Sequence, residues 1–351
     1  MRPLLSRTIV MIHPGSLGDV LLAVPAMVRL RTGFPNHRLA LCAEARVSSL
    51  LFECRIVDAW VSVQGRRAAE LFAGPDMVTG HLRTWLEGCD LAIGWMEDLN
   101  GSLNETLRAV GARKAIVRSP FSMEIGAVHQ RDRFLEIIDD TSFGEGEDIL
   151  LAVPESLLRL GQACLDATGL PSGQPLAVIH PGSGSPNKCV APEILAAAID
   201  AMWGSWVTPV VLEGPADREP VDSLLKLCEK SPIVLQGLDL LTVAGILAQA
   251  DLYVGQDSGI THLAGLMGVR TIALFGPTDP RRWAPSGAKV SVIQGTPCLC
   301  RSWEEVSRCE GKPCLKIPQD NLVASCLAYL NARKAQQRIS SASLVTDYPV
   351  C

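Results

Sequence analysis

Short apolar runs alternate with longer helical patterns along the chain. In the first part, runs typical of buried strands occupy Thr8–His13, Arg38–Cys42, Val57–Val63 and Leu91–Trp95. A pattern with a helical period at Val20–Arg31 separates the first two runs. Strands that alternate with helices of about 10–15 residues indicate parallel sheets covered by helices on both faces. The pattern therefore predicts an α/β protein.

A second series of the same kind begins after the turn-rich segment Pro171–Pro175. Its predicted strands are Leu176–His180, Thr208–Glu213, Ile233–Gln236, Leu252–Val254 and Thr271–Phe275, and its predicted helices are Pro192–Trp203, Val221–Cys228, Leu241–Gln249 and Thr261–Met267. The pentapeptide Ile12-His-Pro-Gly-Ser16 recurs as Ile179-His-Pro-Gly-Ser183, each time where the first strand of a series ends. We therefore predict two Rossmann-like domains, residues 1–170 and 171–330, whose loops face a central cleft. The polar tail 331–351 is expected to be frayed.

Composition and charge exclude some partners. The chain has 351 residues, a net charge of −5 and only 5% aromatic residues, so it has neither the basic surface nor the stacking side chains of a nucleic-acid-binding protein. The charge is uneven, because residues 1–50 contain six arginines and only two acidic residues. This basic face indicates an anionic partner, although arginines on solvated helices would give the same count.

Neither a membrane span nor a secretion signal is expected. No apolar run reaches the roughly 18 residues that a span requires, and the first ten residues lack a small-residue cleavage site. We therefore expect a cytoplasmic protein. Its twelve cysteines are then expected to be reduced rather than paired in disulfides.

The loop after the first strand, Pro14–Asp19, is a candidate site. It contains neither the dinucleotide-binding G-x-G-x-x-G pattern nor a P-loop. Gly15 and Gly18 allow the backbone to approach a ligand closely, with Ser16 between them. Asp19 stands at the entrance of the next helix, where it either performs chemistry or caps the helix.

Three loops of the second series suit a nucleotide. The segment Gly255–His262 follows a strand and opens a helix, whose free N–H groups and dipole favour an anion. Within it, Asp257 suits a ribose hydroxyl or a helix cap, and His262 either donates to a ligand oxygen or is a core histidine. The other two loops are His180–Gly184 with Lys188 beyond it, and Glu213–Glu219. Lys188 would neutralise a diphosphate, unless it is simply a solvated loop lysine.

These motifs, in this order, resemble those of glycosyltransferase family 9, the bacterial lipopolysaccharide heptosyltransferases, over about residues 8–330. The matching segments are Gly15–Asp19 with Pro25, His180–Gly184 with Lys188, Gly214–Glu219, Asp257–Ala264, and Phe275–Pro280 with Trp283. The resemblance implies a GT-B fold, a nucleotide sugar bound mainly by the C-terminal half, and inverting, metal-independent transfer with Asp19 as the base. One departure is the absence of the aromatic residue that the family often has soon after the lysine, since Lys188 is followed by Cys189-Val190-Ala191.

The expected function is transfer of a heptose or related sugar from an ADP-linked donor to an anionic lipopolysaccharide-core acceptor, with at most peripheral contact with the inner membrane surface. The expected catalytic residues are Asp19 and Lys188, the donor-binding residues His180, Gly182, Ser183, Gly184, Glu213, Gly214, Asp257, Ser258, Gly259, Thr261, His262 and Thr278, and the acceptor-side residues Gly15, Ser16 and Gly18. The alternatives are another nucleotide sugar or surface glycan, a non-catalytic nucleotide-sugar-binding protein and an NAD-dependent oxidoreductase. The missing fingerprint disfavours the last of these.

Four cysteines cluster near the C-terminus, at Cys298, Cys300, Cys309 and Cys314. Their spacing is compatible with a tetrahedral thiolate site for zinc or iron, although the first gap is tighter than the usual C-x2-C. A structural metal and reduced thiols without metal are therefore both open. No cofactor is expected for catalysis.

Overall fold

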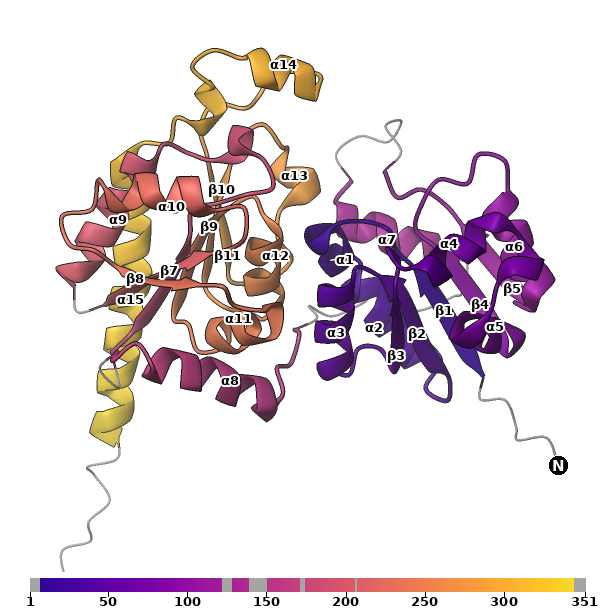
Figure 1. The fold of residues 1–351 in the computed structure, drawn as a ribbon. Coiled ribbons are helices and arrows are strands. Elements are labelled where there is room, and N and C mark those ends of the chain that lie inside the picture. The colour runs from indigo at the N-terminus through magenta and orange to yellow at the C-terminus, as the bar shows by residue number, and fades with distance from the viewer. Residues whose placement is uncertain (1–6, 122–127, 139–149, 171–173, 206, 344–351) are drawn as a thin grey trace, which may run out of the picture.

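A computed structural model describes residues 7–121, 128–138, 150–170, 174–205 and 207–343. In this part of the chain the strands form two separate parallel sheets, one in each half (Figure 1). The first sheet has the strand order β3-β2-β1-β4-β5 and the second the order β11-β10-β9-β6-β7-β8. The predicted α/β class is confirmed.

The first sheet is built from short, mostly buried strands. They are β1 (Thr8–Ile12), β2 (Arg38–Ala43), β3 (Ala59–Ser62), β4 (Cys89–Gly94) and β5 (Lys114–Val117). The helices of this half are α1 (Leu17–Leu22), α2 (Val24–Gly33), α3 (Ala45–Glu53), α4 (Arg66–Ala73), α5 (Gly80–Glu87), α6 (Ser102–Val110) and α7 (Gln130–Ile138), with a 3-10 turn at Pro75–Met77. All five residues of β1 are buried, as expected for a central strand of a sheet covered on both faces.

The second sheet repeats this plan with one more strand. Its strands are β6 (Leu176–His180), β7 (Thr208–Glu213), β8 (Ile233–Gln236), β9 (Leu252–Gln256), β10 (Thr271–Phe275) and β11 (Val290–Gln294). Its helices are α8 (Glu155–Asp166), α9 (Pro192–Trp203), α10 (Arg218–Leu225), α11 (Leu240–Leu247), α12 (Gly259–Leu266), α13 (Pro280–Trp283), α14 (Trp303–Arg308) and α15 (Gln319–Ser343), with 3-10 turns η3 (Pro186–Lys188) and η4 (Pro313–Leu315).

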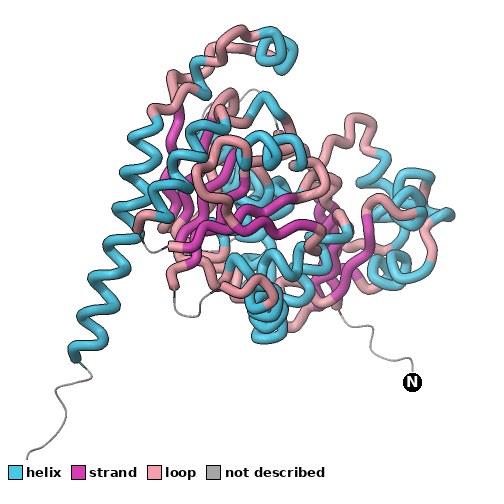
Figure 2. The backbone as a smooth tube through the Cα atoms, turned by 60° about the vertical axis from the view of Figure 1, so that its left-hand side comes forward, coloured by secondary structure: helices cyan, strands magenta, loops and turns pink. Residues whose placement is uncertain are grey.

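Alternating side chains of β6 supply two different cores. Ala177 and Ile179 lie in an apolar cluster with residues of α9, α10 and α15, while Val178 points to the opposite face and joins α8, α11 and α12. Figure 2 shows α15 running along the outer side of this half. The apolar cluster that contains Val178 also includes side chains of α1, α2 and α3. One hydrophobic core therefore spans both halves.

The two halves meet where α1 packs against α12 and α3 against α11 (Figure 1). The closest approach depends on two glycines. A Cβ on Gly259 would lie 2.8 Å from the Leu17 side chain, and one on Gly18 would lie 3.1 Å from the His262 ring. The glycines expected to approach a ligand thus also allow the N-terminal ends of α1 and α12 to meet.

Three features differ from the sequence-based expectations. The helix predicted at Val20–Arg31 is two helices, because the chain turns at Ala23 and Pro25 occupies the first turn of α2. Helix α8 precedes the predicted boundary at residue 171 yet packs on α11, where Gly161 and Gly245 bring the two backbones together. Finally, α15 continues to Ser343, so the tail expected to be frayed is helical over 331–343, while 344–351 lie outside the described residues.

None of the described helices combines the length and the apolar character needed to cross a membrane.

Candidate active site

The two recurring His-Pro-Gly-Ser loops lie at equivalent places. Each loop follows the first strand of its sheet in the sequence, and later strands pair on both sides of that strand. Strand β1 lies between β2 and β4, and β6 lies between β7 and β9. Parallel sheets bind ligands beyond the carboxyl ends of the strands at such switch points. The loops after β1, β6 and β9 are therefore the natural place to build the site, as the sequence predicts.

Asp19 lies in the first turn of α1 and takes part in its cap. The backbone N–H of Ser16 donates to Asp19 Oδ2 at 3.0 Å, and the Ser16 hydroxyl donates to the same oxygen at 2.8 Å. Capping and catalysis are therefore compatible, because both bonds use Oδ2 and Oδ1 can still accept a proton. The carboxylate is partly exposed at the junction with α12.

His13 supports this loop from beneath, a role that the sequence analysis missed. The Gly15 N–H donates to His13 Nδ1 at 3.1 Å, and the ring is fully buried among Trp95 and Phe134. Burial lowers the pKa of His13 to about 4, although the Asp19 carboxylate acts in the opposite direction. A neutral histidine thus shapes the backbone that carries Asp19.

At the N-terminus of α12 the roles of two residues are resolved. Ser258 is the N-cap, and its hydroxyl accepts from the Thr261 N–H at 3.4 Å. Asp257 does not cap the helix. Its Oδ2 instead pairs with Lys188 Nζ at 2.8 Å and accepts from the Thr278 hydroxyl at 2.6 Å. Lys188 is therefore a paired, partly buried lysine tied to the β9–α12 loop, and its role toward a diphosphate stays a prediction.

His262 lies at the contact between the halves. Its ring is buried, and burial lowers its pKa to about 4, although the nearby carboxylates of Asp257 and Asp19 act to raise it. Its Nδ1 is buried without a hydrogen-bond partner among the described residues. His262 therefore offers a neutral hydrogen-bonding group, and not a positive charge, in a site that also contains Asp19, Asp257 and Lys188.

Asp217 connects the loop after β6 with the loop after β7 and was not singled out from the sequence. His180 Nε2 donates to Asp217 Oδ2 at 2.9 Å, and the Gly214 N–H donates to the same oxygen, also at 2.9 Å. Burial alone would raise the pKa of Asp217, but these hydrogen bonds and the His180 ring lower it overall. Because a carboxylate only accepts, His180 Nδ1 is left to accept from the Ser258 hydroxyl at 3.3 Å.

The other residues predicted to bind the donor lie in or next to the same three loops. Ser183 donates to the Asp257 carbonyl at 2.6 Å, and Thr261 donates to the Gln256 carbonyl at 2.5 Å. Gly182 has no room for a side chain, since a Cβ would lie 1.8 Å from Asp217 Oδ1, whereas Gly184 faces open space. Glu213 ends β7 and is partly exposed.

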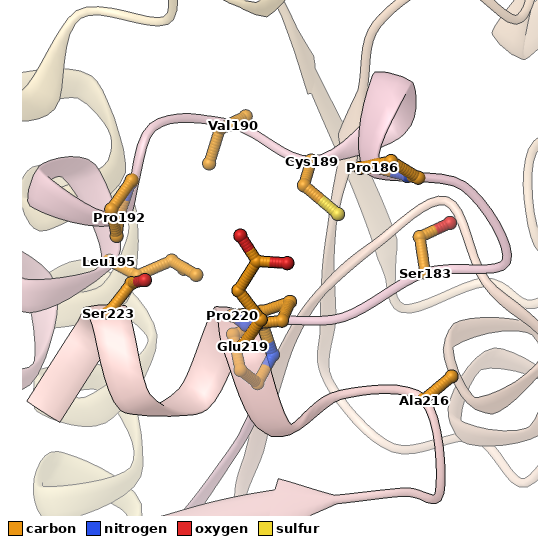
Figure 3. A pocket seen from close by; sticks show the side chains of 11 residues that line it. Ser183, Pro186, Cys189, Val190, Pro192, Leu195, Ala216, Glu219, Pro220 and Ser223 are labelled. Carbon is orange, nitrogen blue, oxygen red and sulfur yellow. The ribbon is translucent and has the colours of Figure 1, made fainter.

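A cavity of about 270 Å³ opens between the β6–α9 loop and α10. Its walls include Ser183, Cys189, Val190 and Pro220, and Figure 3 shows the Glu219 carboxylate directed into its middle. Glu219 belongs to the third predicted loop but was not among the predicted site residues. Its position, one residue into a helix that follows a strand-end loop, was the available signal.

The four clustered cysteines lie in residues 298–314, which we call the cysteine lobe and which include α14. Desolvation, together with the neighbouring thiols of Cys298 and Cys309, raises the pKa of Cys300 to about 11, and the same two neighbours act on Cys314. The thiols are therefore close to one another. Even so, no group of three or more His, Cys, Asp or Glu side chains in the described part of the chain is arranged to hold a metal ion. The metal stays a prediction.

Comparison with known proteins shows which family this chain resembles. Residues 151–308 match the family described as glycosyltransferase family 9 (heptosyltransferase). Lipopolysaccharide heptosyltransferase 3 of Escherichia coli (strain K12) is 23% identical over 286 residues, which cover 76% of this chain and 82% of that protein. These matches confirm the predicted resemblance to glycosyltransferase family 9.

Solved structures of the family share the fold. The glycosyl transferase family 9 protein from Veillonella parvula DSM 2008 matches with a TM-score of 0.78 at 20% identity, covering 93% of this chain and 98% of that one. The ADP-heptose lipopolysaccharide heptosyltransferase II of E. coli matches with a TM-score of 0.73 at 18% identity, covering 93% and 99%. The predicted GT-B architecture of two Rossmann-like units is thereby confirmed.

Proposed function

We propose that this protein transfers a heptose or related sugar from an ADP-linked donor to a lipopolysaccharide-core acceptor, with inversion and without a catalytic metal. One observation carries the proposal. The Asp19 turn of the first half packs directly against the α12 turn of the second half, which carries Asp257 and His262, and Asp257 pairs with Lys188 of η3. A candidate base and a candidate diphosphate-binding site thus lie next to each other.

The donor would lie on the second half. The N–H groups at the start of α12 and the Lys188 ammonium together offer positive charge to a diphosphate. On binding, Lys188 would exchange its ion pair with Asp257 for one with the phosphate. The donor domain at residues 171–330 and the acceptor domain at 1–170 remain part of this proposal. The name of the E. coli heptosyltransferase II relative, which specifies ADP-heptose, supports the choice of nucleotide.

Asp19 would act as the general base. As the acceptor hydroxyl oxygen forms a bond to the anomeric carbon, its proton passes to Asp19 and the bond from that carbon to the diphosphate oxygen breaks. The electron pair leaves with ADP, where Lys188 and the α12 N–H groups stabilise the negative charge. This arrangement supplies electrostatic stabilisation of the leaving group from the chain's own residues.

The acceptor would approach from the first half, near Gly15, Ser16 and Gly18. The name of the E. coli heptosyltransferase 3 relative and the six arginines in residues 1–50 both support an anionic lipopolysaccharide-core acceptor. Such an acceptor is lipid-linked. We therefore infer that the protein acts at the cytoplasmic surface of the inner membrane, with at most peripheral contact. A different nucleotide sugar or surface glycan on the same scaffold is the alternative.

Calorimetric titration with ADP, UDP, GDP and NAD tests the donor assignment. We expect ADP to bind best, and Lys188→Ala to weaken ADP by about 10- to 150-fold, as for a lost charge-assisted hydrogen bond. Because His262 is neutral, His262→Ala should weaken ADP binding by less, about 2- to 13-fold. His81→Ala, an exposed histidine on α5, is the matched control and should bind as the wild type does. Preference for NAD, or unchanged binding in both site variants, would contradict the proposal.

A further inference from the structure

Trp303 is the first residue of α14 and is 51% exposed. Single exposed apolar residues are common on protein surfaces, so exposure alone assigns no role. Its position is more informative, because Lys188 Nζ lies 5.6 Å from the centroid of the indole ring. This distance is within the range of a cation–π interaction.

The Lys188 ammonium has two partners. Asp257 Oδ2 lies 2.8 Å from Nζ, and the Trp303 ring forms the second contact. The carboxylate comes from the loop between β9 and α12, whereas the ring comes from the cysteine lobe. Two segments that are distant in the sequence therefore set the direction of one flexible side chain.

The cysteine lobe is also attached to the turn that carries Lys188. Lys312 Nζ donates to Asn187 Oδ1 at 2.6 Å, and Asn187 Nδ2 donates to the Ser307 hydroxyl at 3.3 Å. At the start of α14 the Ser302 side chain accepts from the Glu305 N–H and caps the helix. The backbone that presents Trp303 is thus fixed relative to η3.

We propose that Trp303 is a positioning residue for Lys188, and that its indole face holds the ammonium where the diphosphate of the nucleotide sugar binds. A lysine side chain that is free to sample many rotamers loses conformational entropy when it is fixed, which weakens binding. An aromatic face beside the ammonium removes some of that freedom in advance. When a diphosphate displaces Asp257, the ammonium can turn toward it and remain over the ring. This inference rests on the proposed function, because the ligand is the diphosphate of that donor.

Titration of ADP into Trp303 variants tests the role of the ring. Trp303→Leu keeps apolar bulk but removes the π face, and we expect ADP to bind about 3- to 10-fold more weakly. Trp303→Phe keeps an aromatic face and should recover most of the affinity. Trp203→Leu is the matched control. Lys230 Nζ lies 3.6 Å from the Trp203 ring at the end of α9, so this variant loses a similar pair but should bind ADP normally.

The same titration in a Lys188→Ala background separates positioning from direct contact. If Trp303 acts through Lys188, adding Trp303→Leu to Lys188→Ala causes no further loss of ADP affinity. An equal loss in both backgrounds would mean that the ring contacts the nucleotide itself, and would overturn the inference. Wild-type affinity in Trp303→Leu would overturn it as well. Failure of the wild-type protein to bind any nucleoside diphosphate would instead overturn the proposed function, and this inference with it.

Discussion

At the scale of single residues, the site depends on partners that lie far apart in the sequence. The residue types at Asp19, Asp257, Lys188 and His262 are visible as candidates from loop position alone. Which of them pair is not visible, because local spacing does not determine contacts between loops. Asp257 was expected to bind ribose or cap a helix, and it is the ion-pair partner of Lys188, while Ser258 provides the cap.

Asp217 shows the same limit from the other direction. It stands in a turn-rich loop among other polar residues, and nothing in the local pattern distinguishes it from Glu213 or Glu219. Only the folded chain brings its carboxylate to His180 and to the Gly214 N–H. Its effect is to hold the loops after β6 and β7 in place beside the start of α12.

The buried histidines predict how stability depends on pH. His13 and His262 have pKa values near 4 in the folded protein and near 6.5 when unfolded. Below pH 6.5 the unfolded chain therefore binds more protons than the folded one. The stability that the two neutral histidines contribute is fully present above pH 6.5 and is lost as the pH falls toward 4. We expect the free energy of unfolding to fall by up to about 1.4 kcal/mol per pH unit for each histidine in this window.

Denaturant unfolding between pH 7 and pH 5 measures this slope. His13→Asn keeps an acceptor for the Gly15 N–H but removes one ionisation, so its slope should be shallower by about the contribution of one histidine. A slope equal to that of the wild type would contradict the assignment of a neutral, buried His13.

At the scale of elements, the second half follows its sequence pattern closely. The strands β6, β7, β8 and β10 and the helix α9 have the predicted bounds, because compact apolar runs there are bordered by turn residues. The helix near Val20 was mispredicted, since an apolar period continues across Ala23, where the backbone turns just before Pro25. The extension of α15 was missed because apolar periodicity fades there, while alanine, glutamine and arginine still favour a helix.

The possible metal site of the cysteine lobe can be tested directly. If the four cysteines form the structural metal site that their spacing allows, elemental analysis of protein purified anaerobically without chelators will find close to one zinc or iron per chain. Desolvation, together with the neighbouring thiols, raises the pKa of Cys300 and Cys314, and a bound cation would act in the opposite direction by favouring the thiolates. The double variant Cys300→Ser/Cys309→Ser should lose the metal, whereas Cys164→Ser on α8 should keep it. Metal-free wild-type protein with reactive, reduced thiols in the lobe would contradict the prediction.

At the scale of the whole molecule, the repeated pentapeptide and the alternating pattern were enough to predict two Rossmann-like units. They could not predict how the units meet. The contact depends on Gly18 facing His262 and on Gly259 facing Leu17, and these are shape relations between surfaces that have no local signature. That contact places the turn with Asp19 beside the turn with Asp257, which is why the halves form one candidate active site.

The role of Asp19 is the central claim, and the turnover of Asp19→Asn tests it most directly. Asparagine retains an oxygen that can accept from the Ser16 N–H and hydroxyl, so the cap of α1 is preserved while the base is removed. Sugar transfer from an ADP-linked donor should fall by about 10²- to 10⁴-fold, with ADP affinity and the unfolding midpoint nearly unchanged. Wild-type turnover in Asp19→Asn would contradict the account and leave Asp19 as a helix-capping residue only.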